Sequence, residues 1–250
     1  MIDIKLLEQL CLCNGISGDE GNVRNLIINE IKDCADDIKT DNLGNLIVFK
    51  KGKKSAKSKL MVSAHMDEVG LMVTDITSDG YLKFDEVGGI DRRVLPGKRV
   101  CVGRNGLNGV IGVKPIHLTN SDEKTAVPKM NDMYIDIGAE SREDALKYVN
   151  YGDGINFEGD FKINGKTVVT KALDDRFGCY VLINLIKSEP EYDMYFTFVV
   201  QEEVGLRGAR PAAFTVNPDF ALVIESTTAA DVAEVDVSHQ VCNLSKGATV

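Results

Sequence analysis

The sequence lacks the features that mark several large classes of protein. No apolar run approaches the roughly 20 residues that a membrane-spanning helix needs, and the acidic first residues lack the layout of a secretory signal peptide. The formal net charge of -9 disfavours general nucleic-acid binding, because backbone phosphates attract lysine and arginine. These absences predict a cytoplasmic protein that binds neither membranes nor nucleic acid.

Cysteine and basic residues also show no functional pattern. The six cysteines are scattered and form no CxxC pair, which favours reduced thiols over a disulfide framework or a sulfur-rich metal site. The basic cluster at residues 50–59 is interpreted as a solvated loop. With 250 residues, 44% of them hydrophobic, the chain is long enough for one large domain or two unequal ones.

The order of the apolar patterns predicts an α/β domain interrupted by a β insert. Helical spacing covers residues 4–13, and a second helix is expected to begin at Ser17, which forms a capping-box pattern with Glu20. A strand or a hairpin turning at residues 42–45 follows. Alternation of strands and helices is typical of an α/β layer structure.

The middle of the chain has a different character. Between about residues 70 and 165 short strand-like runs alternate with glycine turns, which favours a small barrel or sandwich, and Ser141 caps the one convincing helix. After residue 166 the strand and helix rhythm resumes. We therefore predict a first domain split into residues 1–68 and 165–250, and an inserted all-β domain of residues 69–164, a usual domain size.

Four strand-like segments end on side chains that can bind metals. LMVSAHMD ends on His65 and Asp67, TVVTKALDD on Asp174 and Asp175, FTFVVQEE on Glu202 and Glu203, and FALVIES on Glu225. Because the ligand crevice of an open α/β sheet lies beyond the carboxyl ends of its parallel strands, we expect the four groups to lie together. So many carboxylates repel one another unless cations join them. A pair of divalent cations about 3.5–4 Å apart does so, and the sequence therefore predicts metal-assisted hydrolysis.

Each of these groups also has an ordinary structural explanation. Taken alone, His65 is a satisfied, partly buried histidine, and Asp174 with Asp175 is a pair of helix caps favoured by the helix dipole. Glu225 alone is an exposed strand end. The coincidence of four such groups at four strand ends favours the metal site. Histidine with carboxylates and no thiolate suits zinc, cobalt or manganese.

The segments SAHMDEVGLMV, TKALDDRFGC, VVQEEVGLRGA and IESTTAAD together resemble the dimetal aminopeptidases of the glutamyl aminopeptidase and TET type. Some members of that family are labelled cellulase or endoglucanase. The resemblance covers nearly the whole chain. It implies a three-layer αβα catalytic domain with an inserted PDZ-like or barrel-like β domain that supplies dimer contacts. It further implies peptide substrates, two divalent metal ions with zinc as the first choice, and homo-oligomers in which dimers assemble into dodecamers.

The resemblance also implies a role for each residue of the cluster. His65 would bind one metal, and Asp67 would orient its imidazole. Asp174 would bridge both metals and precede a cis peptide bond. Glu202 would be the general base of an aminopeptidase that acts through a metal-bridged hydroxide. The implied metal ligands are His65, Asp174, Glu203 and Glu225, of which Glu225 stands where the family usually has aspartate.

The chain departs from the family pattern near its C-terminus. Family members are longer, and the histidine ligand of the second metal lies beyond the last strand-like segment of this chain. His117 and His239 do not fill that place well, so we expect either a fragment or an incomplete second metal site. The preferred N-terminal residue of a substrate is not predicted.

Three other functions remain as alternatives. A related metal-dependent carboxypeptidase or deacylase would use the same carboxylate cluster, and an inactive homologue would have lost its second metal. A glycosidase is disfavoured, because it needs two carboxyl groups without a metal and leaves His65 and Asp174 unexplained.

Overall fold

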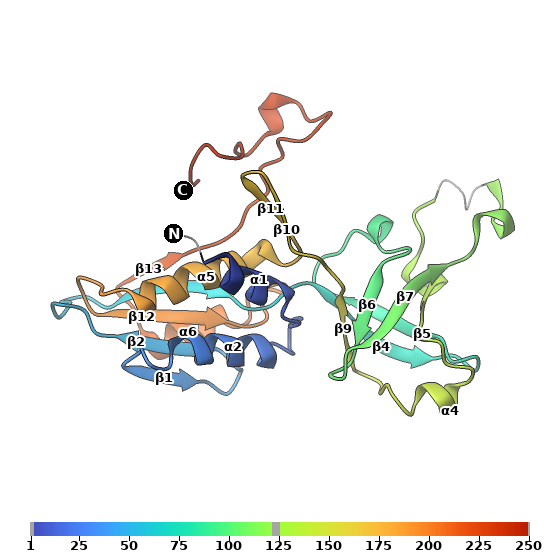
Figure 1. The fold of residues 1–250 in the computed structure, drawn as a ribbon, viewed down its shortest axis with the longest axis horizontal. Helices are drawn as coiled ribbons and strands as arrows, with labels where there is room; N and C mark the ends of the chain where they lie inside the picture. Colours follow the sequence, from blue (N-terminus) through green and yellow to red (C-terminus); the bar gives the residue numbers. More distant parts are fainter. Residues whose placement is uncertain (1–2, 122–125, 250) are drawn as a thin grey trace.

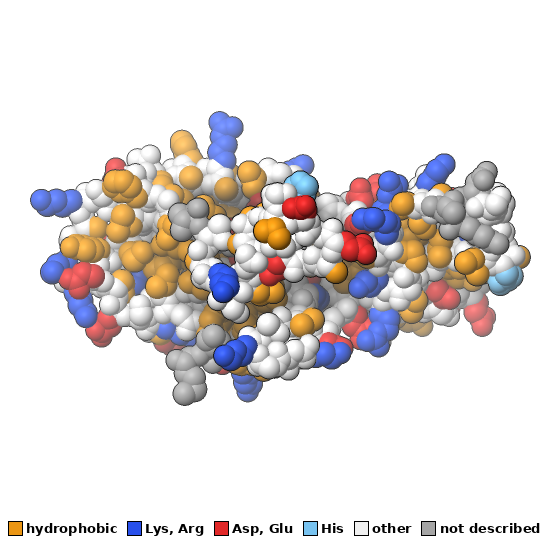
Figure 2. Space-filling view, turned by 90° about the horizontal axis from the view of Figure 1, so that it is seen from above, with side chains coloured by type: hydrophobic (Ala, Val, Ile, Leu, Met, Phe, Trp, Pro, Cys, Tyr) orange, Lys and Arg blue, Asp and Glu red, His pale blue; other side chains and the backbone are white. Residues whose placement is uncertain are grey.

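The computed structural model describes residues 3–121 and 126–249. It has an α/β half and a closed six-stranded barrel, which lie side by side along the longest axis of the molecule (Figure 1). Acidic and basic side chains are interspersed over both halves, while hydrophobic side chains gather mainly over the α/β half in the view from above (Figure 2). No helix among the described residues is long and apolar enough to cross a membrane.

Five strands form the sheet of the α/β half in the order β1-β2-β12-β3-β13. The middle strand β12 pairs in parallel with β3, which pairs in parallel with β13, so these three strands end at the same edge of the sheet. The strands β1 and β2 form an antiparallel hairpin, which confirms the hairpin interpretation of residues 42–45. Their bounds are β1 (Asp37–Thr40), β2 (Leu46–Lys50), β3 (Leu60–His65), β12 (Met194–Val199) and β13 (Phe220–Val223).

Helices cover both faces of this sheet. Side chains alternate between the two faces along each strand, so a strand with consecutive apolar residues contributes to a core on each face. Leu46 and Val48 of β2 point into a core shared with α1 (Ile4–Leu12), α2 (Gly21–Ile31) and α5 (Leu173–Lys187). Ile47 lies between them on the opposite face, in a smaller cluster with Val216 of α6 (Ala209–Val216). The three-layer αβα arrangement is therefore confirmed.

The predicted β insert is a closed barrel with its own core. Leu71 and Val73 of β4, Ile111 of β7 and Ile155 of β9 are buried inside it. Ser141 caps the short helix α4, because its Oγ accepts a hydrogen bond from the Asp144 amide at 3.2 Å. In barrel order the strands are β4 (Gly70–Ile76), β5 (Leu82–Val87), β8 (Met133–Asp136), β7 (Leu107–Val113), β6 (Arg99–Val102) and β9 (Gly154–Phe157). The short helical elements described are α4 (Arg142–Ala145), η1 (Arg92–Val94), η2 (Ile116–Leu118), η3 (Met130–Asp132) and η4 (Val237–His239).

Two local predictions were wrong. The second helix begins at Gly21 rather than at Ser17, and the Ser17 hydroxyl donates a hydrogen bond to Asp67 instead of capping the helix.

The strand β11 (Thr167–Val169) pairs with β10 (Lys162–Asn164) in a separate hairpin, so it does not extend the main sheet. Asp174 therefore lies at the start of α5 and not at the end of a sheet strand. The hairpin also spans the proposed boundary at residue 164, and the domain limits stay a prediction.

Candidate metal centre

His65 is the last residue of β3 and lies at the centre of the acidic cluster, with a side chain that is 2% exposed. Its Nε2 atom is 3.0 Å from Asp174 Oδ1 and 3.5 Å from Glu225 Oε1. The same atom is 3.9 Å from Glu202 Oε2. On the other side of the ring, Nδ1 lies 3.1 Å from the backbone oxygen of Asp67 and 3.4 Å from its Oδ1. Nδ1 thus has acceptors that fix the ring, and Nε2 faces the carboxylates, as a metal-binding imidazole requires.

The start of α5 supplies two acids with different surroundings, joined by a cis peptide bond. The hydrogen bond with His65 lowers the pKa of Asp174, although partial burial opposes this. Asp175 is fully buried, accepts hydrogen bonds from the backbone N–H groups of His65 and Gly178, and has a pKa that burial raises to about 8. The sequence allowed either acid to cap the helix. Asp175 has that role, and Asp174 faces the acidic cluster.

A buried ion-pair network lies next to the start of α5. Arg176 is fully buried and donates to the backbone oxygens of Leu10, Cys13 and Met66 at 2.6–2.7 Å. Glu68 accepts from Lys171 at 2.7 Å and from Arg176 at 3.5 Å. A buried charge is stable only when it is paired and hydrogen-bonded, as here. The network fixes the start of α5 against α1 and against the chain that follows β3.

Four consecutive backbone N–H groups after β12 donate to side-chain oxygens from other parts of the chain. They join Val200 to Asn45 Oδ1 at 2.9 Å, Gln201 to Glu20 Oε1 at 3.0 Å, Glu202 to Asp67 Oδ1 at 3.0 Å, and Glu203 to Asp67 Oδ2 at 3.1 Å. Gln201 has a φ of 55°, so the chain leaves the extended conformation there. The carboxylates of Glu202 and Glu203 consequently lie on one side, each with an oxygen within 4.8 Å of the other.

The electrostatics of the cluster follow from burial and from these hydrogen bonds. Burial opposes the ionisation of Asp67, but hydrogen bonds from His65, from the Ser17 hydroxyl and from the Glu202 amide outweigh it and lower its pKa. Burial raises the pKa of Glu202, and it raises that of Glu203 to about 7. Burial alone would lower the pKa of His65, yet its carboxylate partners raise it above the ordinary value. The cluster therefore gathers several acids around a single imidazole.

Two groups of side chains in the described part of the chain can hold a cation. One consists of His65, Asp174 and Glu225, and the other of His65, Glu202 and Glu203, with ligand atoms within 4.8 Å of one another in each group. An imidazole with carboxylate oxygens is a donor set that fits zinc, cobalt or manganese. His117 on η2 and His239 on η4 belong to neither group.

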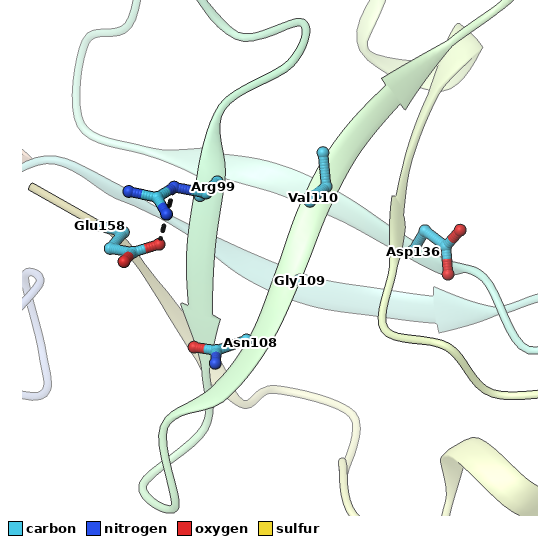
Figure 3. Close-up of a pocket in the computed structure, with 6 residues that line it drawn as sticks. All are labelled: Arg99, Asn108, Gly109, Val110, Asp136 and Glu158. Atoms are coloured by element: carbon cyan, nitrogen blue, oxygen red, sulfur yellow. Dashed lines mark ion pairs between the residues drawn. The ribbon is translucent and has the colours of Figure 1, made fainter.

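A shallow pocket of about 220 Å³ lies elsewhere, on the outer surface of the barrel (Figure 3). Arg99 of β6 is paired there with Glu158 at 3.1 Å between Nε and Oε2. The lining residues are Arg99, Asn108, Gly109, Val110, Asp136 and Glu158. None of these residues belongs to the acidic cluster, so this pocket is separate from the candidate metal centre.

Residues 44–250 match the family model of the M42 glutamyl aminopeptidases. The chain belongs to this family. A curated protein of Acetivibrio thermocellus is 48% identical and matches 92% of this chain and 67% of its own length. The lysyl aminopeptidase of Pyrococcus furiosus is 35% identical over 92% of this chain and 68% of that protein. This M42 chain is therefore a peptidase by family, and it spans about two thirds of the length of these relatives.

Solved structures of similar proteins have the same fold. The TET1 peptidase of Pyrococcus horikoshii is 44% identical and superposes with a TM-score of 0.81 over 92% of this chain and 72% of that chain. A protein of Thermotoga maritima described as an endoglucanase is 43% identical, with a TM-score of 0.79 over 92% of this chain and 68% of that chain. The resemblance inferred from the four motifs, including the endoglucanase label, is thereby confirmed.

The structure of this M42 chain brings together the six side chains to which the resemblance assigns roles: His65, Asp67, Asp174, Glu202, Glu203 and Glu225. Asp175, which the sequence placed with them, instead accepts a hydrogen bond from the Gly178 amide of α5. Their separate roles remain predictions. Sequence reasoning missed Ser17, Glu20 and Asn45, which contact Asp67 or the turn after β12. The SGDE stretch carries a signal, but the spacing of its serine and glutamate fits a helix cap equally well.

Proposed function

We propose that this chain carries the metal centre of an aminopeptidase that removes N-terminal residues from peptides. The observation that carries the proposal is the set of His65, Asp174 and Glu225, whose ligand atoms lie within 4.8 Å of one another in a member of the M42 family. Glu202 lies beside this set, 3.9 Å from the same imidazole nitrogen. A metal-binding group with an adjacent free carboxylate suits hydrolysis assisted by a general base.

We assign two divalent cations to the cluster, with zinc as the first choice and cobalt or manganese as alternatives, and the set of His65, Asp174 and Glu225 supports the first of them. His65, Asp174 and Glu225 would hold one ion, and Glu203 would hold the second together with Asp174. When bound, such ions polarise the scissile carbonyl group and lower the pKa of bound water. The concentration of carboxylates around one imidazole supports this assignment, because it leaves their mutual repulsion uncompensated without cations.

Glu202 is the residue to which we assign proton transfer. Its side chain is 26% exposed, so its carboxylate can reach a substrate while its backbone N–H stays bound to Asp67. Burial raises its pKa, which makes it a better proton acceptor than an exposed glutamate. In our proposal it takes a proton from the attacking water and returns it to the leaving amine. Asp67 orients His65 and holds the backbone of both glutamates.

We also propose that the chain acts on peptides as a homo-oligomer, with the barrel supplying dimer contacts. The support is that the TET1 peptidase of Pyrococcus horikoshii is described as assembling into a tetrahedron or a large octahedral shell. A related solved structure is described as a dodecamer. The size of the particle in solution, measured by light scattering, tests this part of the proposal.

The activity is tested with chromogenic aminoacyl anilides in the presence of zinc or cobalt. We expect release of the chromophore, and its loss after treatment with a chelator. A related metal-dependent carboxypeptidase or deacylase would use the same acids, so N-acyl amino acids are assayed in parallel. Turnover of N-acyl amino acids, with no turnover of any aminoacyl anilide, would overturn the assignment.

A further inference from the structure

The segment from Gly15 to Glu20 is fixed at the junction of the two halves of the molecule. Ile16 is 1% exposed and packs against Gly70 of β4, where a Cβ atom would lie 2.1 Å from Ile16 Cγ2. The Gly15 carbonyl accepts a hydrogen bond from the Glu68 amide at 3.0 Å. The segment is thus tied to the barrel through Ile16, and to the chain that follows β3 through Gly15.

From this fixed position the segment directs two buried polar side chains at the metal centre. The Ser17 hydroxyl, in a residue that is 7% exposed, donates to Asp67 Oδ2 at 2.5 Å. Glu20 is 3% exposed, and its Oε1 accepts from the Gln201 amide at 3.0 Å and from the Gly18 amide at 2.7 Å. Neither the Ser17–Asp67 nor the Glu20–Gln201 hydrogen bond caps a helix, although the spacing of Ser17 and Glu20 is that of a capping box.

Both contacts converge on the turn that carries the two glutamates. The N–H groups of Gln201, Glu202 and Glu203 all donate to buried carboxyl groups, and successive backbone N–H groups can form a concave site for anions. Here the anions belong to the protein, because Asp67 accepts two of these N–H groups and Glu20 accepts the third. Ser17 occupies a further acceptor position on Asp67, so it limits how this carboxylate can rotate.

We propose that Ser17 and Glu20 are positioning residues of the metal centre. Ser17 acts through Asp67, and Glu20 acts through the Gln201 amide, to hold Glu202 and Glu203 where they can transfer a proton and bind a cation. The inference rests on the proposed function, because it concerns the same site. Groups that orient ligands and bases in this way usually change metal affinity or activity by about 10–100-fold when they are removed.

The experiment compares variants that delete each contact with variants that keep it. Ser17→Ala removes the hydroxyl donor, and Ser17→Thr retains it. Glu20→Ala removes the acceptor, whereas Glu20→Gln retains an amide oxygen that can accept from both N–H groups. Ser63→Ala is the matched control, since Ser63 is 6% exposed and its hydroxyl contacts only the backbone oxygen of Thr197 among its described partners, at 3.4 Å.

Three quantities are measured on the full chain: calorimetric binding of Co²⁺ to metal-free protein, hydrogen exchange in peptides covering residues 196–206, and kcat and KM on aminoacyl anilides. For Ser17→Ala and Glu20→Ala we expect Co²⁺ binding and kcat to fall at least about tenfold. Exchange should rise at the turn, with KM little changed. Ser17→Thr, Glu20→Gln and Ser63→Ala should stay close to wild type.

The outcomes separate this inference from the proposed function. If the wild-type chain binds Co²⁺ and turns over substrate while Ser17→Ala and Glu20→Ala behave like Ser63→Ala, the inference is overturned alone. Loss without rescue by Ser17→Thr and Glu20→Gln would also overturn it, because it would show a general structural role. If the wild-type chain neither binds Co²⁺ nor hydrolyses any substrate, the proposed function fails and the inference fails with it.

Discussion

The two sides of the candidate metal centre are held in different ways. On one side, the turn after β12 fixes Glu202 and Glu203 through backbone N–H groups that donate to the fully buried Asp67. On the other side, Glu225 follows the edge strand β13, and its side chain is 42% exposed. Its Oε1 accepts a hydrogen bond from the next amide, Ser226, at 3.1 Å.

The difference teaches that the acids of one site need not share one function in the fold. The turn after β12 is part of the buried framework, so a change to its anchor should disturb both stability and chemistry. Glu225 stands outside that framework, because among the described residues the backbone N–H group that donates to its carboxylate is that of the next residue, Ser226. A change to Glu225 should therefore alter metal binding and leave stability nearly unchanged. Ligands that move freely bind less tightly than ligands whose rotamers are locked by their surroundings.

The largest effect is expected from Glu202→Gln. The amide keeps the shape of the side chain but cannot accept a proton, so turnover of aminoacyl anilides should fall about 10²–10⁴-fold. Bound metal, measured by elemental analysis, should stay near the wild-type level because Glu202 is not assigned as a ligand. Glu191→Gln is the control, since the described contact of the Glu191 side chain is an exposed ion pair with Lys54 at 2.7 Å. Loss of the metal together with activity would show that Glu202 is a ligand rather than the base.

The next effect is expected from Asp67→Asn on the buried side. An amide has one acceptor oxygen, so it cannot accept from Ser17, Glu202 and Glu203 as the two carboxylate oxygens do. Leaving a buried donor without a partner should lower the free energy of unfolding by about 1–3 kcal/mol. Co²⁺ affinity should fall about 10–100-fold. Urea unfolding and calorimetry measure the two quantities, and a variant as stable as wild type would contradict the framework role of Asp67.

A smaller and more selective effect is expected from Glu225→Gln on the exposed side. The amide is a weaker ligand than a carboxylate, so we expect Co²⁺ affinity to fall about tenfold. The free energy of unfolding should change by less than about 0.5 kcal/mol, as for other exposed positions. A loss of stability like that of Asp67→Asn would remove the contrast between the two sides.

The contrast also explains which parts of the molecule could be predicted from sequence. The order of helical and strand-like apolar patterns is local, so it predicted an α/β layer structure. In that structure Leu46 and Val48 are buried on one face of the sheet and Ile47 on the other. By contrast, Ser17 bonds to a residue 50 positions away, and its local spacing to Glu20 is the same in a helix cap. The TVVTKA stretch likewise predicts a strand but does not say which sheet it joins, since pairing partners lie outside any local pattern. Strand ends predicted the position of His65, Glu202 and Glu225, whereas Asp174 comes from the start of α5. The side chains that anchor the turn after β12 could be found only from the fold.

The smallest effect concerns the pH dependence of stability at Glu20, on the buried side. Burial raises the pKa of Glu20 above its ordinary value of 4.5, and the nearby charge of Asp67 raises it further, against the lowering effect of its backbone hydrogen bonds. The folded chain therefore keeps this proton at a pH where the unfolded chain has lost it, so the contribution of Glu20 to the free energy of unfolding declines as the pH rises above 4.5. Glu20→Gln has no proton to lose and keeps the acceptor for Gln201. The urea midpoint of Glu20→Gln relative to wild type should accordingly increase between about pH 4 and about pH 7, and a constant difference would show that the proton on Glu20 does not affect folding.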